Sequence, residues 1–294
     1  MSNIHDYMKK KFLVTGASGF IASHVSDLLT KKGFEVILFD KKFSKYKQKR
    51  QKMFLGNLKN LNNLIKATKK VDTIFHFAAD ADLNESNRNP FETIENNING
   101  TVKIIKACIK NKIKKIIFAS SIYAISEQGG IYSTSKLSSE MIIERLCKKF
   151  NIKFVILRFG TVYGERANTF NTVQKYINQA RDKLKIHRET KGNEIRSYIH
   201  VKDVANVVCL SLKKKYENNY YNIFGKKKIL VKELFNILKD EIPGLKISYS
   251  KSDKKKYNYK VNPFTYKIRK GSNIRLKKYI DVKNGVSNLI RNDI

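Results

Sequence analysis

The sequence predicts an α/β fold in which a doubly wound parallel sheet is followed by a smaller C-terminal α/β lobe. Short apolar segments alternate with helix-length amphipathic segments through the first 160 residues, and the first apolar segment ends in a glycine-rich turn. Strands that alternate with helices indicate a parallel sheet with helices on both faces, because parallel strands need long crossover connections. After Gly160 this alternation becomes less regular, which predicts a second and smaller unit.

The first 40 residues predict a strand, a turn, a helix and a second strand. Lys11–Thr15 is a short apolar run, and Phe20–Lys32 carries apolar residues at helical spacing. Gly33 is typical of the position that follows a helix. Phe34–Phe39 reads as a strand that is closed by Asp40. Together these segments predict a βαβ unit.

The alternation continues along the chain, and right-handed crossovers then favour a doubly wound sheet. The segment Lys251–Lys278 is basic and tyrosine-rich without a clear period; we interpret it as loops and short strands of the smaller lobe, with a disordered basic patch as the alternative. The further predicted strands are Thr73–Ala78, Lys115–Ala119, Lys153–Phe159, Ser197–Val201 and Tyr220–Phe224, and the further helices are Phe91–Lys110, Tyr132–Phe150, Lys202–Lys214 and Val231–Asp240.

The composition combines a normal core content with a large positive charge. Of 294 residues, 41% are hydrophobic, which is enough to bury a sizeable core. Lys and Arg number 60 against 25 Asp and Glu, a formal charge of +35 that would suit a nucleic-acid partner. However, the lysines are spread along every segment, Pro occurs 3 times and Trp is missing, as an AT-rich coding sequence would give. We therefore expect no specific nucleic-acid partner.

Other classes of protein receive no support from the sequence. No run approaches the roughly 20 apolar residues of a membrane helix, and the N-terminal apolar run is too short for a signal peptide. Three cysteines lie far apart, and five histidines show no metal-ligand spacing. We expect a cytoplasmic protein without a membrane partner or a metal.

The turn Thr15–Ala22, TGASGFIA, has the features of a phosphate-binding turn in a Rossmann sheet. Gly16 allows a tight turn, Gly19 allows the backbone to approach a pyrophosphate, and the small Ala22 allows the helix to pack on the strand. The free N–H groups and the dipole of the following helix favour phosphate at this end. We assign cofactor binding in this turn to Gly16, Ser18, Gly19, Phe20 and Ile21.

Asp40 ends the second strand about 20 residues beyond the turn, where a carboxylate bonds the adenosine ribose and repels a 2′-phosphate. It favours NAD over NADP, although Lys41 and Lys42 could tolerate the extra phosphate. Residues 1–160 are therefore expected to form an NAD-binding Rossmann domain, to which part of 196–224 returns. Residues 161–294 are expected to form a smaller substrate-binding lobe.

A Ser-Tyr-Lys set follows the strand Lys115–Ala119. The pair Ser120-Ser121 closes this strand, at the end where ligands bind in a doubly wound sheet. Tyr132 and Lys136 lie four residues apart at the start of a helix, and so on one face. A phenol with a pKa of about 10 can act as a base near neutrality only if a cation stabilises its phenolate, which the ammonium can do. Chance occurrence in a lysine-rich chain is the alternative.

These motifs resemble those of the extended short-chain dehydrogenase/reductases, and among them the NAD-dependent nucleotide-sugar epimerase/dehydratase group of the UDP-glucose 4-epimerase type. The resemblance extends from about Lys11 to about Gly285. It rests on the order and spacing of TGASGFIA (15–22), FHFAA (75–79), NINGT (97–101), FASSIYA (118–124), YSTSK (132–136), LRFGTVYGERAN (157–168), RSYIHVKDVA (196–205) and YYNIFG (220–225).

The resemblance implies a role for each matching residue. Ser121 corresponds to the catalytic Ser/Thr, Tyr132 to the base and Lys136 to its partner. NAD is the implied cofactor and a nucleotide-sugar the implied substrate. The remaining positions are Asn57 and Leu58 at the adenine site, Ala78 and Ala79 along the cofactor cleft, Asn99 behind the active site, Thr161 at the substrate phosphate where the family often has Asn, and Arg196 at the nucleotide diphosphate.

The resemblance also implies the chemistry. In this family Tyr132 would remove a hydroxyl proton while a hydride leaves C4 of the sugar for NAD. Dehydratases carry Asp-Glu directly after the catalytic Ser/Thr, whereas this chain has Ile122 and Tyr123 there. We therefore expect epimerisation at C4 through a transient 4-keto intermediate. The alternatives are an NAD(P)-dependent nucleotide-sugar reductase or dehydratase and, less favoured, a non-catalytic dinucleotide-binding or nucleic-acid-binding protein.

Two further expectations concern assembly and pathway. The helices Phe91–Lys110 and Tyr132–Phe150 carry more apolar positions than one sheet face needs, and the resemblance implies that they pair with their copies in a homodimer. The C-terminal residues Tyr259–Phe264 and Tyr279–Asp281 resemble a subgroup associated with surface-polysaccharide genes, which favours polysaccharide biosynthesis.

Overall fold

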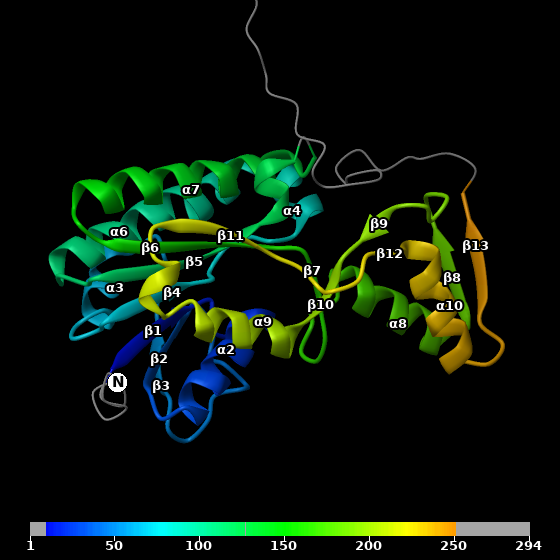
Figure 1. Cartoon of the computed structure of the whole chain (residues 1–294), viewed down its shortest axis with the longest axis horizontal. Helices are drawn as coiled ribbons and strands as arrows, with labels where there is room; N and C mark the ends of the chain where they lie inside the picture. Colours follow the sequence, from blue (N-terminus) through cyan, green and yellow to red (C-terminus); the bar gives the residue numbers. More distant parts are fainter. Residues whose placement is uncertain (1–9, 127, 251–294) are drawn as a thin grey trace, which may run out of the picture.

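Figure 1 shows the computed structural model, which describes residues 10–126 and 128–250. The C-terminal segments considered above, Lys251–Lys278 and Tyr279–Asp281, lie outside the described residues. A seven-stranded parallel sheet has the order β11-β6-β5-β4-β1-β2-β3. Its strands are β1 (Lys11–Thr15), β2 (Glu35–Asp40), β3 (Lys52–Leu55), β4 (Thr73–His76), β5 (Lys115–Ser121), β6 (Lys153–Phe159) and β11 (Asn219–Ile223).

The middle strands are nearly continuous apolar runs because helices cover both faces of the sheet. Phe12, Leu13 and Val14 of β1 are completely buried, and every residue of β4 and β5 is buried. The chain builds the sheet outward from β1 in one direction and from β4 in the other. The carboxyl ends of β1 and β4 therefore form the switch point at which such sheets bind ligands.

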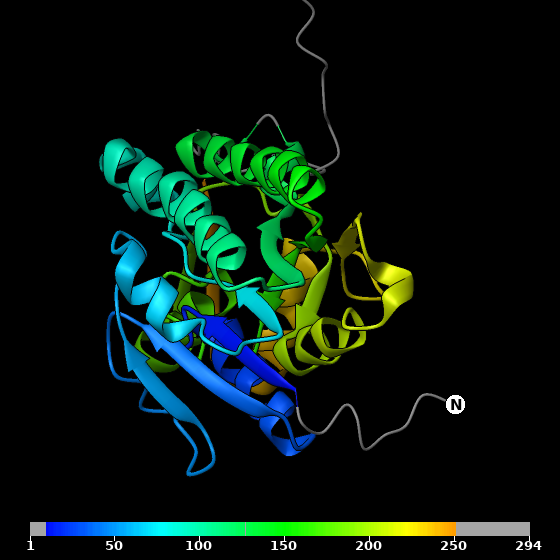
Figure 2. The same ribbon diagram turned by 90° about the vertical axis from the view of Figure 1, so that its left-hand side faces the viewer.

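Two layers of helices enclose the sheet, which confirms the doubly wound α/β prediction. The helices α2 (Phe20–Lys31) and α9 (Val201–Leu210) cover one face, where Phe12 and Val14 are buried. The opposite face buries Leu13 against α3 (Leu61–Ala67), α6 (Gly100–Lys110) and α7 (Gly130–Lys149). Figure 2 shows α6 and α7 side by side over the sheet.

The helix predicted over Phe91–Lys110 contains a change of helical pitch. It is divided into α5 (Pro90–Ile94), a π-helical turn η1 (Glu95–Asn99) and α6. A π turn shifts the angular position of every residue that follows, so helical spacing alone misplaces side chains near it. Asn97, inside this turn, is only 3% exposed.

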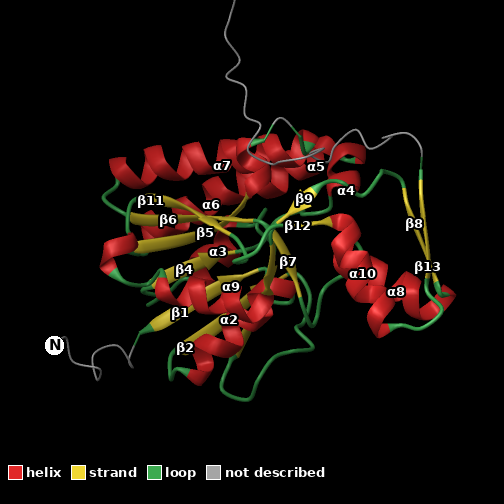
Figure 3. Ribbon diagram, turned by 45° about the vertical axis from the view of Figure 1, so that its right-hand side comes forward, coloured by secondary structure: helices red, strands yellow, loops and turns green. Residues whose placement is uncertain are grey.

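A second, smaller lobe packs against the carboxyl end of the sheet (Figure 3). The helices α8 (Thr172–Lys183) and α10 (Val231–Glu241) pack with the parallel pair β8 (Lys185–Arg188) and β13 (Lys246–Tyr249). This lobe has its own small core, which includes Tyr176, Ala180, Ile186, Phe235 and Leu238. Two short pairs connect it to the sheet: β7 (Thr161–Tyr163) with β10 (Tyr198–His200), and β9 (Ile195–Arg196) with β12 (Ile229–Leu230).

The structure differs from the sequence prediction mainly in short or polar elements. The helix predicted over Lys202–Lys214 ends at Leu210, and a separate 3-10 turn, η3 (Lys214–Tyr216), follows it. The prediction did not include α3, α8 or α4 (Leu83–Arg88), whose N-terminal residues are capped by the side chains of Asn60, Asn171 and Asp82. Within the described part of the chain, no helix is long and apolar enough to cross a membrane, and no group of His, Cys, Asp and Glu could hold a metal ion.

Candidate active site

A cavity of about 1340 Å³ lies at the carboxyl ends of the strands, between the sheet and the second lobe. Pockets for one small ligand typically have a volume of about 300–1,000 Å³, so this one can hold two ligands side by side. Ser18 and Asn99 are the predicted site residues that do not line it. Those that line it are Gly16, Gly19, Phe20, Ile21, Asp40, Asn57, Leu58, Ala78, Ala79, Ser121, Tyr132, Lys136, Thr161 and Arg196.

Gly16 and Gly19 shape the turn that leads into α2. Gly16 has φ +68°, and a Cβ atom there would lie 2.7 Å from the backbone nitrogen of Ala78, so only glycine fits. Gly19 donates a hydrogen bond to the carbonyl oxygen of Gly16 (2.9 Å) and begins the helix without a side-chain cap. The turn therefore brings bare backbone and an uncapped helix N-terminus to the cavity, which suits phosphate.

Ser18 and Asp40 form one structural unit at the edge of the cavity. The backbone N–H groups of Ser18 and Lys42 donate to the two carboxylate oxygens of Asp40, at 3.0 and 3.1 Å. The Ser18 hydroxyl donates to the carbonyl oxygen of Lys42 (2.9 Å). Ser18 thus orients Asp40, and Asp40 and Lys41 are the residues that line the cavity here.

The wall beneath the expected adenine position follows β3. Leu58 is buried under Gly100, where an added Cβ atom would come within 3.0 Å of its Cδ1 atom. The side-chain oxygen of Asn57 accepts a hydrogen bond from the backbone of Lys59 (3.0 Å), which fixes its orientation at the cavity.

His76 supports the cavity from below. Its Nδ1 atom lies 2.9 Å from Thr15 Oγ1, and its Nε2 atom lies 3.0 Å from Thr101 Oγ1. Complete burial lowers the pKa of His76 to about 3, so its ring is neutral at physiological pH. Thr15 Oγ1 also accepts the backbone N–H groups of Phe77 and Ala78 (3.2 and 3.1 Å). Together, His76 and Thr15 hold the ends of β1 and β4 in place.

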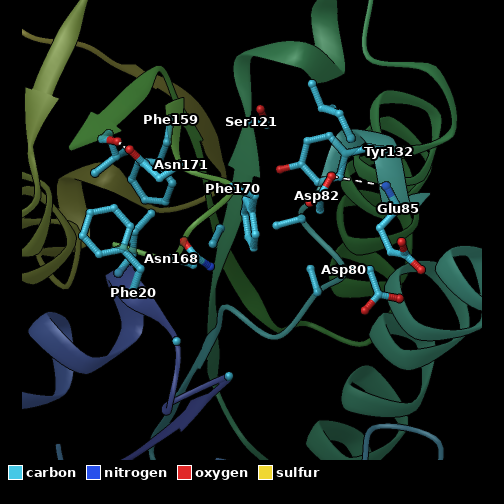
Figure 4. A pocket seen from close by; sticks show the side chains of 18 of the residues that line it. Phe20, Asp80, Asp82, Glu85, Ser121, Tyr132, Phe159, Asn168, Phe170 and Asn171 are labelled. Atoms are coloured by element: carbon cyan, nitrogen blue, oxygen red, sulfur yellow. Dashed lines mark hydrogen bonds between the residues drawn. The ribbon is translucent and has the colours of Figure 1, made fainter. Parts of the chain in front are cut away.

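Ser121, at the end of β5, and Tyr132, on α7, face the cavity together (Figure 4). Burial raises the pKa of Tyr132 to about 12, and the hydroxyl of Ser121, which hydrogen-bonds to it, opposes this increase. The phenol is therefore neutral in the structure as it stands. It needs additional positive charge nearby before it can act as a base.

Lys136 provides one such charge. Its Nζ atom donates a hydrogen bond to the carbonyl oxygen of Ala119 (2.8 Å) and lies 5.9 Å from the centre of the Tyr132 ring. Burial lowers the pKa of Lys136 to about 8, while the carboxylates of Glu140 and Asp80 act in the opposite direction. The ammonium form still predominates at neutral pH, one helical turn from the phenol.

The asparagine behind the site is Asn97, and the expectation for Asn99 was wrong. Asn99 is exposed and donates to the carboxylate of Glu95. Asn97 instead accepts the N–H of Asp80 (2.7 Å) and donates to its carbonyl oxygen (3.1 Å) and to Ser135 Oγ (2.9 Å). The π turn places Asn97 on the inner side, where Asn97 links α7 to the loop after β4.

The second lobe closes the other side of the cavity. Thr161 and Arg196 lie there as expected, and Arg196 is 9% exposed. The lining on this side includes residues that the sequence analysis did not identify, among them Phe170, which is 46% exposed, and Asn171, which caps α8. Figure 4 shows Asn168, Phe170 and Asn171 facing Tyr132 across the cavity. Another of these residues is Arg188, which is buried and ion-paired with Glu194 (2.5 Å).

Carboxylates also line the cavity on the Tyr132 side. Asp80, Asp82 and Glu85 come from the loop after β4 and from α4. The side chain of Asp82 accepts the N–H groups of Asn84 (2.8 Å) and Glu85 (3.2 Å), and Asp80 accepts a hydrogen bond from the Asn96 amide (2.8 Å). This wall is acidic, whereas the opposite wall carries Arg196 and Arg188.

Comparison with known sequences and structures gives consistent matches. The model of the NAD dependent epimerase/dehydratase family matches residues 12–223. The UDP-glucose 4-epimerase of Halalkalibacterium halodurans is 27% identical over 261 residues, covering 76% of this chain and 78% of that protein. The UDP-N-acetyl-alpha-D-glucosaminuronate decarboxylase of Bacillus cytotoxicus is 29% identical over 245 residues, covering 74% and 75%.

Some relatives are much longer than this chain. A trifunctional UDP-glucose 4,6-dehydratase/UDP-4-keto-6-deoxy-D-glucose 3,5-epimerase/UDP-4-keto-L-rhamnose-reductase of Arabidopsis thaliana is 28% identical over 257 residues, which cover 74% of this chain but 37% of that protein. A second Arabidopsis enzyme of the same name is matched over 39% of its length. The chain thus spans about two fifths of these curated relatives.

Two solved structures are similar over most of both chains. The UDP-N-acetylglucosamine 4-epimerase from Methanobrevibacter ruminantium M1, in complex with UDP-N-acetylmuramic acid, superposes with a TM-score of 0.77 at 25% identity, over 88% of this chain and 93% of the other. The UDP-glucuronic acid 4-epimerase from Bacillus cereus, in complex with UDP-glucuronic acid and NAD, gives a TM-score of 0.75 at 26% identity, over 82% and 86%.

Proposed function

The chain belongs to the NAD dependent epimerase/dehydratase family, whose cofactor is NAD, and from this premise we propose that it inverts a nucleotide-sugar at C4. The observation that carries the proposal is the joint placement of Ser121, Tyr132 and Lys136 in a cavity large enough for a dinucleotide and a nucleotide-sugar. The solved relatives that hold UDP-sugars support this class of substrate.

The residues of the chain fit NAD. The Gly16 position is a cradle that a Cβ atom would fill, and the uncapped N-terminus of α2 suits a pyrophosphate. Asp40 would bond the adenosine ribose with a carboxylate already oriented by Ser18. When bound, NAD accepts a hydride from the sugar and returns it.

Residues of the chain itself would transfer the proton of the C4 hydroxyl. The phenolate form of Tyr132 would accept the proton of the C4 hydroxyl and so become the neutral phenol, while the Ser121 hydroxyl holds the same sugar oxygen by a hydrogen bond. The Lys136 ammonium, 5.9 Å from the ring centre, would lower the free energy of the phenolate, and bound oxidised NAD would add the further positive charge that this buried phenol needs. Tyr132 returns the proton to oxygen in the reverse step.

Inversion requires that the 4-keto sugar present its other face before reduction. Thr161 and Arg196, on the second lobe, would hold the nucleotide diphosphate while the sugar turns in the cavity. Ile122 and Tyr123 follow Ser121 and provide no carboxylate there, which favours epimerisation over elimination of water.

A second candidate is a nucleotide-sugar 4,6-dehydratase. It is favoured by the carboxylates of Asp80, Asp82 and Glu85 on the Tyr132 side of the cavity, which could assist loss of water after the same first oxidation. The plant relatives named above include this activity among their three.

The test is incubation of the purified full chain with UDP-, GDP-, CDP- and dTDP-sugars, followed by NMR and mass spectrometry of the products. We expect one sugar nucleotide to give its C4 epimer at unchanged mass and without net consumption of NAD. Loss of one water would instead establish the dehydratase, and stoichiometric consumption of NADPH would establish a reductase.

We further propose that the chain forms a homodimer through α5, α6 and α7. Phe91 of α5 is 85% exposed and Met141 of α7 is 57% exposed, and Ile94 of α5 and Ile109 of α6 are also exposed. Large exposed apolar side chains on neighbouring helices suit a protein interface. Association of two copies would cover them.

A further inference from the structure

Glu140 is a fully buried carboxylate on α7, one helical turn after Lys136, and its exposure is 1%. Its Oε1 atom accepts hydrogen bonds from the Ser120 hydroxyl (2.5 Å) and from Arg158 Nε (2.9 Å). Its Oε2 atom accepts a third from Arg158 Nη2 (2.6 Å). One side chain therefore joins α7 to β5 through Ser120 and to β6 through Arg158.

The attachment point on β5 is the part of the strand that carries the catalytic groups. Ala119, on one side of Ser120, accepts the hydrogen bond from Lys136 Nζ (2.8 Å). Ser121, on the other side, is the hydroxyl that faces Tyr132. The contact between Glu140 and Ser120 thus fixes the strand segment on which both Lys136 and the substrate oxygen depend.

We propose that Glu140 is a positioning residue for the Tyr132–Lys136 pair: it ties the end of β5 to α7 and places a negative charge that holds the Lys136 ammonium beside Tyr132. This inference rests on the proposed function only in assigning the pair to catalysis. The charge and the contacts themselves belong to the free protein.

The surroundings of Lys136 contain few other charges. Asp80, from the loop after β4, is the other carboxylate that acts on its pKa. His76 on β4 is neutral, and the rings of Phe118 (4.9 Å) and Tyr132 (5.9 Å) complete the contacts. Burial lowers the pKa of Lys136 to about 8 although both carboxylates raise it. Loss of one carboxylate therefore moves the ammonium toward deprotonation at neutral pH.

The surroundings of Glu140 provide an ion-pair partner. Arg158 of β6 forms the ion pair, and the guanidinium also lies over the ring of Tyr220 on β11, 4.8 Å from its centre. A buried ion pair does not by itself stabilise a fold better than a well-packed apolar pair would. A role in holding Lys136 explains a charged pair at this place.

Glu144 offers a matched control. It lies one turn further along α7, accepts a hydrogen bond from the Tyr220 hydroxyl (2.6 Å) and pairs with Lys148 (2.5 Å). It is therefore also a paired carboxylate on the same helix. Glu144 is not among the groups that act on the pKa of Lys136.

The test measures the protonation of Lys136 directly, by NMR titration of the free full-length protein carrying 15N-labelled lysine. The Lys136 signal is assigned by its loss in Lys136→Met. In Glu140→Gln, whose amide keeps the shape and can still accept from Ser120, we expect the titration midpoint to move to lower pH by about 1 unit. In Glu144→Gln we expect it to stay within experimental error of the wild type.

The kinetic counterpart is the pH profile of turnover with the sugar nucleotide identified above. The alkaline limb, where Lys136 loses its proton, should move to lower pH in Glu140→Gln and stay in place in Glu144→Gln. An unchanged Lys136 midpoint in Glu140→Gln overturns the inference, whatever the activity. If Tyr132→Phe retains full activity while the midpoint does shift, the assigned chemistry fails and the effect of Glu140 on Lys136 stands.

Removal of the Glu140 charge alone leaves the partly buried Arg158 without its ion-pair partner, which can destabilise a fold. Glu140→Gln combined with Arg158→Met removes both charges and provides the same measurement if the single variant does not fold. The same shift in midpoint is expected in the double variant. A midpoint equal to that of the wild type would overturn the inference there too.

Discussion

The Nζ atom of Lys136 lies 5.9 Å from the ring centre of Tyr132, one turn earlier on α7. Burial moves the pKa values of the two groups apart: it lowers that of the Lys136 ammonium to about 8 and raises that of the Tyr132 phenol to about 12. Removal of the proton from the phenol therefore requires further positive charge in the cavity.

Replacement of Tyr132 by Phe removes the hydroxyl and keeps the ring. We expect turnover to fall by about 10²–10⁴, the usual contribution of a general base, with unchanged folding and NAD binding. Activity on the identified substrate and a thermal unfolding curve are the two measurements. Wild-type turnover in this variant would exclude Tyr132 as the base.

The Asp40 carboxylate should set the preference for NAD. Asp40→Asn keeps an oxygen that can accept the Ser18 N–H group but removes the charge that faces a 2′-phosphate. The ratio of the NADP and NAD dissociation constants should fall in this variant, as measured by titration of both cofactors. Asp72→Asn, whose side chain accepts the N–H of Lys11 at the other end of β1, serves as control and should leave the ratio unchanged. Equal affinities in the wild type would mean that Lys41 and Lys42 dominate.

Arg196 should separate substrate binding from general binding of polyanions. It is one of 60 cationic residues but lies nearly buried at the cavity, where salt screens less than on the surface. Arg196→Ala should raise the dissociation constant of the nucleotide-sugar by about 10- to 100-fold, as expected for loss of a charge-assisted hydrogen bond. DNA binding should stay the same and should weaken steeply as salt rises.

Titrations with DNA and with the sugar nucleotide, at low and at physiological salt, provide the check. Lys183→Ala changes an exposed residue of α8 and is the control for the loss of one positive charge. Sequence-selective DNA binding that survives physiological salt would contradict this prediction and support a nucleic-acid function.

Met141 should report on the proposed dimer. It is 57% exposed on α7, so Met141→Glu should leave the fold intact while placing a charge in the interface. Light scattering at micromolar concentration should give a dimer mass for the wild type and a monomer mass for the variant. Ile237→Glu changes an apolar side chain of α10 that is 52% exposed, and should remain dimeric. A monomeric wild type would reject the interface.

His76 should make the fold sensitive to acid. Its pKa is about 3 in the folded protein against an ordinary value of 6.5, so between these pH values only the unfolded chain binds the proton. The free energy of unfolding should therefore fall with decreasing pH from 6.5 to 3, by up to about 1.4 kcal/mol per pH unit, with no contribution above 6.5.

Denaturant unfolding at a series of pH values tests this effect. His76→Gln cannot titrate and should show a shallower acid slope than the wild type. His187→Gln changes a histidine exposed on β8 and should keep the wild-type slope. Parallel slopes for the wild type and His76→Gln would contradict the assignment.

The parts of the site that depend on local spacing could be predicted from the sequence. Gly16 follows the first strand and Asp40 ends the second, so the sequence positions of these strands locate both residues. Tyr132 and Lys136 lie four residues apart on one helix, which places them on the same face. Asn97 could not be located in this way because the π turn between Ile94 and Gly100 changes the helical phase. The structure shows that Asn97 faces inward together with Thr101, four residues later. The Thr101 hydroxyl is buried and donates a hydrogen bond to the Asn97 carbonyl oxygen (2.6 Å).

The second lobe was less predictable for a physical reason. Phe170 and Arg188 reach the cavity only because residues 161–200 fold back over the sheet, and no sequence period marks such a contact. The helix α8 has few apolar residues: it buries Val173, Tyr176 and Ala180, and Ile177 packs beside them. Short strands such as β9 and β12, with two residues each, have no period at all.

The return of α9 and β11 to the first sheet has a consequence for how the chain is made. Val204 and Val208 of α9 and Ile223 of β11 belong to the core that contains Phe12 of β1, yet they follow α8 and β8 in the sequence. During synthesis, the nucleotide-binding sheet cannot complete its core until the ribosome has also released the elements between residues 161 and 200. Both lobes should consequently acquire protease resistance together, late in translation, and unfold in a single cooperative transition.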